Sequence, residues 1–121
     1  MLSEELKYKI LKIFHENPEI SQRDLSKQLG ISLGKVNYCV KALVEKGFVK
    51  IRNFQNRENK AHYLYLLTPH GIKEKAQVTL RFLQAKISEF EQINNEISQL
   101  KNEVAANGHY VEDNRAASLI K

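Results

Sequence analysis

Residues 20–53 carry a set of helix boundary signals that leaves few choices of local structure. Ser21 is a suitable N-cap, and Gly30 suits the left-handed conformation that ends a helix. Ser32 can cap a second helix, and Gly47 is placed to end it. The spacing predicts two short helices joined by a tight turn and followed by a strand.

The second of these helices, about residues 33–46, separates into two faces on a helical wheel. The apolar face is predicted to be buried and consists of Leu33, Val36, Val40, Leu43 and Val44. The opposite face consists of Gly34, Lys35, Tyr38, Lys41, Ala42 and Glu45, with Asn37 at the boundary. This division indicates a helix that packs on a core and presents polar groups to solvent or to a partner.

Residues 48–53 and 62–68 are rich in β-branched and aromatic side chains and are predicted to be strands. The polar stretch between them, residues 54–61, contains Arg57 and Lys60. We expect a β-hairpin with an exposed tip. Two helices around a turn, followed by such a hairpin, make a winged helix-turn-helix, which places one helix in the major groove of DNA.

A much longer helix is predicted after Thr68-Pro69, because helical periodicity continues from Ile72 to Val104 without proline or glycine. About 35 residues at about 1.5 Å each make a helix of roughly 50 Å. Its apolar positions recur at spacings of three and four: Ala76, Leu80, Leu83, Ile87, Phe90, Ile93, Ile97, Leu100 and Val104. This coiled-coil repeat has a stammer at Phe90, whereas a strict heptad places Asn94 and Lys101 in the seam. We expect a dimer seam.

The predicted fold is therefore mainly α with a small β-hairpin wing (α+β). Residues 1–68 form a winged helix-turn-helix domain, which begins with a helix at residues 3–16. Residues 69–106 form a long, coiled-coil-like dimerisation helix, and residues 107–121 form a flexible tail. Residues 1–67 hold 12 Lys/Arg against 7 Asp/Glu, and the remainder holds 7 of each, so the whole net charge of +5 lies in the first part. That part is expected to attract an anionic partner such as nucleic acid.

Other features of the composition argue against several classes of function. No apolar run reaches the roughly 18 residues needed to span a membrane, and the N-terminus lacks the features of a signal peptide. The single cysteine, Cys39, fits a reducing cytoplasm. The chain has four histidines, and they are scattered: His15, His62, His70 and His109. No nucleophile–base pattern is present either, so we expect neither an enzyme nor a metal or cofactor.

The block SLGKVNYCVKALVEKGFVK, followed by LLTPHG, resembles MarR-type winged-helix regulators. The matching positions are Leu43, Gly47, Phe48, Val49, Leu67, Thr68 and Gly71. The longer stretch from HENPEISQRDL to HGIKEKA is similar to the exopolysaccharide-associated branch of that family. The resemblance implies a bacterial, cytoplasmic, dimeric DNA-binding protein. Because the winged domain starts almost at residue 1, we expect residues 70–104 to supply most of the homodimer contacts. Whether the protein binds a small-molecule effector is left open.

We therefore expect a sequence-specific regulator that binds double-stranded DNA. It is expected to be a dimeric repressor on an inverted-repeat operator, with exopolysaccharide genes suggested by the resemblance. Candidate contacts from the helix are Ser32, Gly34, Lys35, Asn37, Tyr38 and Lys41. Candidate contacts from the wing are Arg52, Arg57 and Lys60. The dimer seam is predicted to consist of Leu80, Leu83, Ile87, Phe90, Ile93, Ile97, Leu100 and Val104.

Each candidate contact has a chemical reason. Ser32, Lys35 and Lys41 can meet phosphates, and Gly34 allows close approach of the backbone. Asn37 can pair with an adenine edge, while Tyr38 can contact a base or a phosphate. The simpler alternative is that these side chains are only solvated.

Two further alternatives concern the whole chain and its cysteine. A winged helix with a long amphipathic helix can also be a module that pairs with another protein. Cys39 lies beside the buried stripe, so a packing role is favoured over redox sensing.

Overall fold

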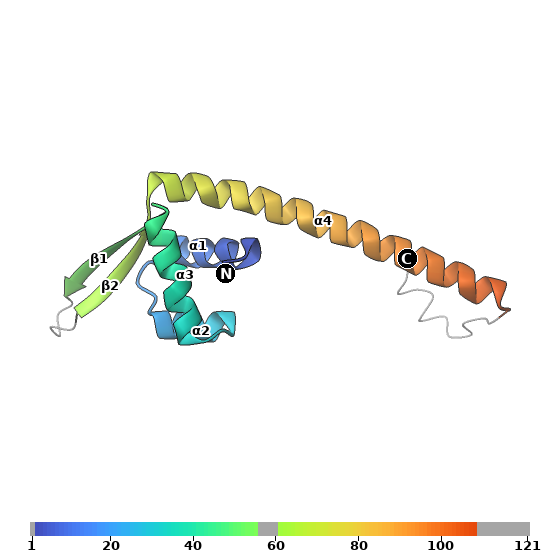
Figure 1. Ribbon diagram of the computed structural model, residues 1–121, viewed down its shortest axis with the longest axis horizontal. Coiled ribbons are helices and arrows are strands. Elements are labelled where there is room, and N and C mark those ends of the chain that lie inside the picture. The colour runs from blue at the N-terminus through green and yellow to red at the C-terminus, as the bar shows by residue number, and fades with distance from the viewer. Residues whose placement is uncertain (1, 56–60, 109–121) are drawn as a thin grey trace. The chain divides into compact units, whose positions relative to one another are not determined.

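A computed structural model of the 121-residue chain describes residues 2–55 and 61–108 (Figure 1). The elements follow in the order α1 (Glu4–Glu16), α2 (Gln22–Leu29), α3 (Leu33–Glu45), β1 (Val49–Gln55), β2 (Ala61–Leu67) and α4 (Pro69–Ala106). The predicted fold class is confirmed: a winged helix with a two-stranded antiparallel hairpin and a long C-terminal helix. The chain divides into two compact units, residues 1–82 and 83–121, and α4 contributes to both.

Serine caps determine where the first three helices begin. The hydroxyl of Ser3 accepts from the Leu6 amide at 3.1 Å, and that of Ser21 accepts from the Asp24 amide at 3.0 Å. Ser32 caps α3 in the same way. Each hydroxyl satisfies an amide that has no partner within its own helix. The N-caps predicted at Ser21 and Ser32 are confirmed.

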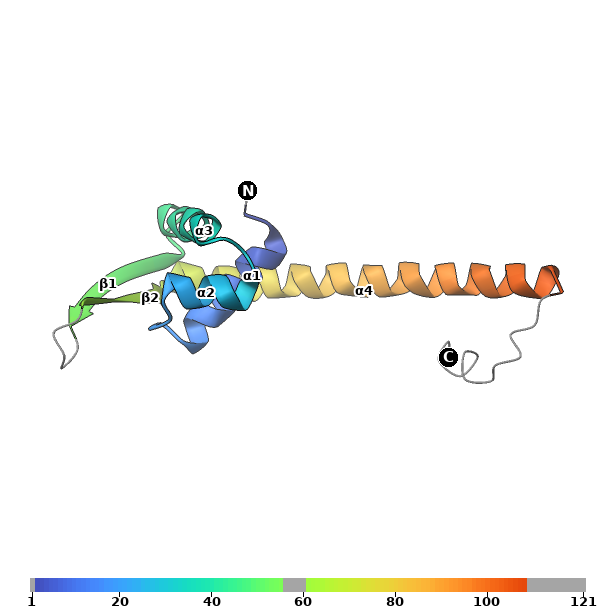
Figure 2. The same ribbon diagram turned by 90° about the horizontal axis from the view of Figure 1, so that it is seen from below.

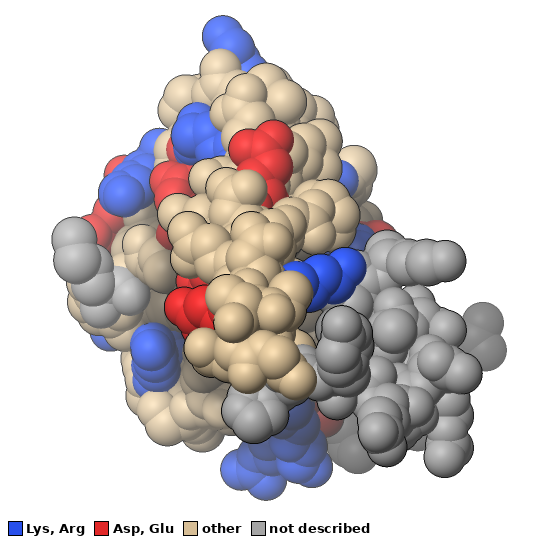
Figure 3. All heavy atoms as spheres, turned by 90° about the vertical axis from the view of Figure 1, so that its right-hand side faces the viewer, with Lys and Arg blue, Asp and Glu red and all other residues tan. Residues whose placement is uncertain are grey.

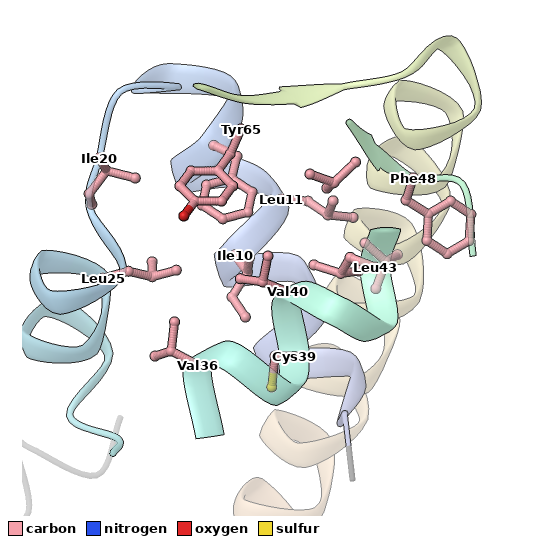
Figure 4. Packing of buried hydrophobic residues seen from close by; sticks show 13 residues of the cluster. Ile10, Leu11, Ile20, Leu25, Val36, Cys39, Val40, Leu43, Phe48 and Tyr65 are labelled. Atoms are coloured by element: carbon pink, nitrogen blue, oxygen red, sulfur yellow. The ribbon is translucent and has the colours of Figure 1, made fainter. Parts of the chain in front are cut away.

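The core of the first unit lies where α1, α2, α3 and β2 meet (Figure 4). Helix α3 runs across α1 and α2 rather than alongside them (Figures 1 and 2). The rings of Phe14 and Tyr65 stack with centroids 4.8 Å apart, which joins α1 to the hairpin. The fully buried side chains are Ile10, Leu11, Phe14, Leu25, Val36, Cys39, Val40, Leu43 and Val78.

The first turns of α4 pack on α1 through both apolar and charged contacts. Tyr8 and Phe82 stack with ring centroids 4.9 Å apart. The ammonium of Lys7 is nearly buried and lies 3.2 Å from the Glu74 carboxylate and 3.7 Å from that of Glu4. A buried ammonium requires such partners, because removing it from water without them is costly. These contacts fix the start of α4 against the winged domain.

The hairpin is longer than the sequence predicts. Val49 pairs with Leu67 at its base, and pairing continues to Gln55 opposite Ala61. The stretch 54–61, expected to be a linker, therefore contributes residues to both strands. Phe54 and His62 face each other with ring centroids 5.3 Å apart, and this cross-strand pair favours continued pairing. The second strand ends at Leu67, one residue earlier than expected, and Thr68 lies directly before α4, where its hydroxyl accepts from the Gly71 amide as a cap.

Candidate nucleic-acid interface

Helix α3 is held in the first unit by one buried stripe. Val36, Cys39 and Leu43 have no exposed surface. These three side chains belong to the buried cluster that Figure 4 shows. Because they occupy one side of the helix, the remaining side is presented to solvent.

The turn between α2 and α3 fixes the direction in which α3 leaves. Gly30 has φ +66°, a left-handed conformation that costs little only for glycine. The amide of Gly30 donates to the Ser26 carbonyl at 2.9 Å, and the Ser26 hydroxyl donates to the Ile31 carbonyl at 2.5 Å. At the start of α3, the Ser32 hydroxyl accepts from the Lys35 amide at 3.1 Å. The turn is therefore closed by hydrogen bonds on both sides.

The far end of α3 is joined to the start of α4. Gly47 has φ +77°, and the Phe48 amide donates back to the Leu43 carbonyl at 3.0 Å. The Thr68 hydroxyl donates to the Gly47 carbonyl at 2.5 Å and accepts from the Gly71 amide at 2.9 Å. The backbone of Phe48 lies against Gly71 so closely that a Cβ at residue 71 would overlap its carbonyl. The motif residues identified in the sequence thus anchor α3 to α4.

The solvent-facing side of α3 carries the candidate contacts. Gly34, Asn37, Tyr38 and Lys41 recur at helical spacing, and all four are exposed. Lys35 is exposed on the flank of this face, and Ser32 is exposed at its N-terminal edge. Apart from the helix's own backbone and the adjacent residues, no heavy atom lies within 4 Å of the position that a Cβ on Gly34 would occupy, so this point of the face is open. The face combines hydrogen-bonding groups with two cations.

Leu33 differs from its prediction, because it is 47% exposed instead of buried. Leu33 lies one turn before Val36. At Leu33 no neighbouring helix or strand of the described residues fully covers the apolar stripe of α3. The Leu33 side chain lines a groove of about 710 Å³ between α2, α3 and β2. The groove is lined by Glu19, Ile20, Ser21, Gln22, Arg23, Leu33, Gly34, Asn37, His62, Tyr63 and Tyr65.

Sequence reasoning missed Leu33 and Arg23 as parts of this surface. Arg23 is exposed in the first turn of α2 and borders the same groove as Asn37. Its position two residues after the Ser21 cap is a signal that could have identified it, since helix starts are commonly exposed. Tyr65 packs in the core, whereas Tyr63 is 54% exposed and lines the groove.

Both strands of the wing are described, and residues 56–60 between them lie outside the described residues. Arg52 lies on β1 opposite Leu64 and is exposed. Arg57 and Lys60, the other two candidates from the hairpin, lie outside the described residues. Arg52 is therefore the candidate wing residue whose position can be compared with α3.

Cys39 is fully buried, and burial raises the pKa of its thiol, while the positive charge of Lys35 acts in the opposite direction. A buried, protonated thiol is a poor nucleophile. Over residues 2–55 and 61–108, no group of three His, Cys, Asp or Glu side chains is arranged to hold a metal ion. In the same residues, no helix is long and apolar enough to cross a membrane.

The predicted seam forms a row of exposed apolar side chains on α4. Leu83, Ile87 and Phe90 are 54%, 49% and 63% exposed. Leu80, Ile93 and Leu100 are also exposed, and Ile97 and Val104 are half-buried. Figure 3, which faces the side where α4 ends in Figure 1, shows a largely uncharged surface with scattered charges of both signs. Apolar rows of this size are typical of interaction surfaces.

Comparison with known proteins places this geometry in a recognised fold. Residues 3–50 match the family model described as winged helix-turn-helix DNA-binding. Comparison with curated proteins gives no match.

Solved structures resemble a larger share of the chain. Apo wild-type MarR from E. coli is 22% identical, with a TM-score of 0.60 over 83% of this chain and 74% of that one. PcaV from Streptomyces coelicolor is 16% identical, with a TM-score of 0.60 over 83% of this chain and 72% of that one. A transcriptional regulator homologue from Pyrococcus horikoshii is 17% identical, with a TM-score of 0.54 over 71% of this chain and 83% of that one. At these identities the likeness establishes the fold.

Proposed function

We propose that the protein is a bacterial, cytoplasmic transcriptional regulator that binds double-stranded DNA sequence-specifically as a homodimer. The observation that carries this proposal is the exposed face of α3, where Gly34, Asn37 and Lys41 recur at helical spacing opposite a fully buried stripe. A helix that is capped, buried on one side and polar on the other can enter a major groove, which is wide enough for one helix. The match of residues 3–50 to a winged helix-turn-helix DNA-binding model supports this use.

Each side chain on this face has a distinct task in the proposed complex. The Asn37 amide pairs with one adenine edge: its NH₂ donates to adenine N7, and its oxygen accepts from the adenine N6 amino group. Lys35 and Lys41 neutralise phosphates. Ser32 caps the N-terminus of α3, where it and the backbone amides can contact another phosphate. Tyr38 contacts a base or a phosphate, and Gly34 allows the backbone to come close to a base edge.

The wing supplies a second set of contacts in this proposal. Arg52 lies on β1, which follows α3, and Arg57 and Lys60 fall in the sequence between β1 and β2. An arginine that enters a narrow minor groove is attracted by its enhanced negative potential. The wing therefore adds affinity and sensitivity to DNA shape.

The second copy of the reading helix comes from homodimerisation through residues 70–104. The exposed apolar row on α4 needs a cover, and a second copy of the same row provides one of matching chemistry. Two α3 helices then contact half-sites about one helical turn, roughly 34 Å, apart on an inverted repeat. A protein this small represses most simply by blocking a promoter. The resemblance to the exopolysaccharide-associated branch makes exopolysaccharide genes the first targets.

Selection of binding sites from a random DNA pool, combined with solution mass, tests the proposal. We expect enrichment of an inverted repeat and the mass of a dimer. Footprinting the promoter beside the protein's own gene, and those of exopolysaccharide genes, then identifies the operator. A monomeric protein that binds no DNA sequence more tightly than random DNA would contradict the proposal. That result would favour a module that pairs with another protein.

A further inference from the structure

Leu33 is a large apolar side chain that remains nearly half exposed in the first turn of α3. The neighbouring apolar residue, Ile31, packs against the core, and Val36, one turn later, is fully buried. Leu33 instead borders the groove that also contains Gly34 and Asn37. A leucine in this position loses the benefit of burial in the free protein and regains it only when another molecule covers it.

We infer that Leu33 contacts the C5-methyl group of a thymine and is a specificity-determining residue of the DNA interface. This assignment rests on the proposed function. Thymine is the one unmodified base that presents a methyl group in the major groove, and apolar side chains distinguish it by contact with that methyl. The first residues of a recognition helix are those that reach base edges most directly.

The position of Leu33 relative to Asn37 predicts where the thymine lies. The two residues are four apart on one helix, so their side chains are neighbours about 5–6 Å apart. Successive base pairs are about 3.4 Å apart along DNA. The thymine is therefore expected one or two base pairs from the adenine that Asn37 contacts. Gly34, between them in the sequence, has no side chain that would hold Leu33 away from the DNA.

The charges near Leu33 favour DNA over an apolar small molecule or peptide as the occupant. Arg23 borders the same groove, and Lys35 and Lys41 are exposed on the same helix. A groove that combines Leu33 with a cation at its border suits a ligand that has phosphates outside and methyl groups inside. The groove also contains Glu19, which an approaching phosphate would avoid, so a phosphate is expected on the Arg23 side.

Replacing thymines by deoxyuridine tests the contact, because it removes the methyl and leaves base pairing unchanged. The probe is the inverted-repeat duplex selected from the random pool, with each thymine position replaced in turn, symmetrically in both half-sites. With wild-type protein we expect one position at which replacement weakens binding about fourfold per half-site, the change given by losing one buried methyl. With Leu33→Ala we expect weaker binding to the original duplex and no further loss on replacement there.

Two variants provide matched controls. Leu33→Met keeps an apolar side chain and should retain sensitivity to the methyl. Asn37→Ala should lower affinity for the whole site but leave the ratio between thymine and uracil duplexes unchanged. Thermal unfolding checks that Leu33→Ala is folded, which its exposed position predicts.

The outcomes separate this inference from the proposed function. Absence of specific DNA binding by wild-type protein would overturn both. Specific binding with no methyl-sensitive position would overturn the role of Leu33 alone. Full methyl sensitivity retained in Leu33→Ala would have the same consequence.

Discussion

At the residue scale, Gly71 shows how one missing side chain can determine the geometry of a domain. Its Cα lies against the backbone of Phe48, and a Cβ there would overlap the Phe48 carbonyl oxygen. That carbonyl also accepts from the Thr68 amide at 3.1 Å, so it cannot move without loss of a hydrogen bond. The close contact fixes the end of α3 relative to the start of α4.

Gly71→Ala should therefore lower the free energy of unfolding by about 2 kcal/mol, the usual cost of forcing an extra carbon into a packed site. Urea denaturation monitored by circular dichroism measures the change. Gly34→Ala is the matched control, because it adds the same methyl to a helix at a point where no atom outside the helix's own backbone and the adjacent residues lies within 4 Å. The control should leave stability unchanged or raise it by up to about 1 kcal/mol. Equal stabilities for both variants would show that the Phe48 contact is unimportant.

Cys39 gives a second prediction at this scale, which concerns pH. Burial raises the pKa of its thiol above the ordinary value of about 9. The folded state therefore holds the proton more tightly than the unfolded chain. The resulting stability is complete below the unfolded pKa and is lost as pH rises through the folded value. Between pH 8 and the most alkaline pH at which folding persists, wild-type protein should lose more free energy of unfolding than Cys39→Ala. Parallel losses in the two proteins would contradict a buried, protonated thiol.

At the element scale, the charged contacts of α1 with α4 can be tested against an exposed pair on α1. The side chains of Lys7 and Glu74 are only 10% and 13% exposed, whereas those of Lys9 and Glu5 are 48% and 52% exposed. Glu74→Gln should lower the free energy of unfolding by about 2 kcal/mol, because it leaves a nearly buried ammonium with only the more distant Glu4.

Glu5→Gln removes the exposed pair and should cost less than about 0.5 kcal/mol. Chemical denaturation of both variants at low and high salt gives the comparison. A loss for Glu74→Gln as small as that for Glu5→Gln would show that the buried pair does not hold α4 on α1.

Element starts and ends were the most predictable part of the structure, because they depend on local chemistry. Ser21, Gly30 and Ser32 act within a few residues of themselves, so their caps and turn follow from the sequence. The hairpin length was less predictable, since the pairing of Phe54 with His62 joins residues that are distant in the chain. Leu33 could not be assigned from a helical wheel, which gives the direction of a side chain but not whether another element covers it.

At the scale of the whole molecule, the predicted seam joins two DNA-reading units in the proposed dimer. Phe90 is 63% exposed in the middle of the apolar row. Phe90→Asp should yield a monomer, because a carboxylate in an apolar seam must be buried without a partner. Analytical ultracentrifugation measures the mass. Loss of the dimer should also weaken binding to the inverted repeat far more than binding to a half-site.

Gln92→Asp is the matched control, since Gln92 lies on the opposite side of the helix from Phe90 and gains the same charge. It should remain a dimer. A dimer that persists in Phe90→Asp would place the seam elsewhere on the chain.

The most direct test of the central claim is the salt dependence of DNA binding for Lys41→Ala, measured on the selected duplex. If the exposed face of α3 lies in the major groove, each Lys41 neutralises one phosphate, and a dimer loses two such contacts. The slope of log affinity against log salt should then flatten by about two units, with weaker binding at low salt. Lys12→Ala, which removes an exposed lysine from α1, should leave both values unchanged. Wild-type affinity and slope in a folded Lys41→Ala protein would contradict the docking of α3.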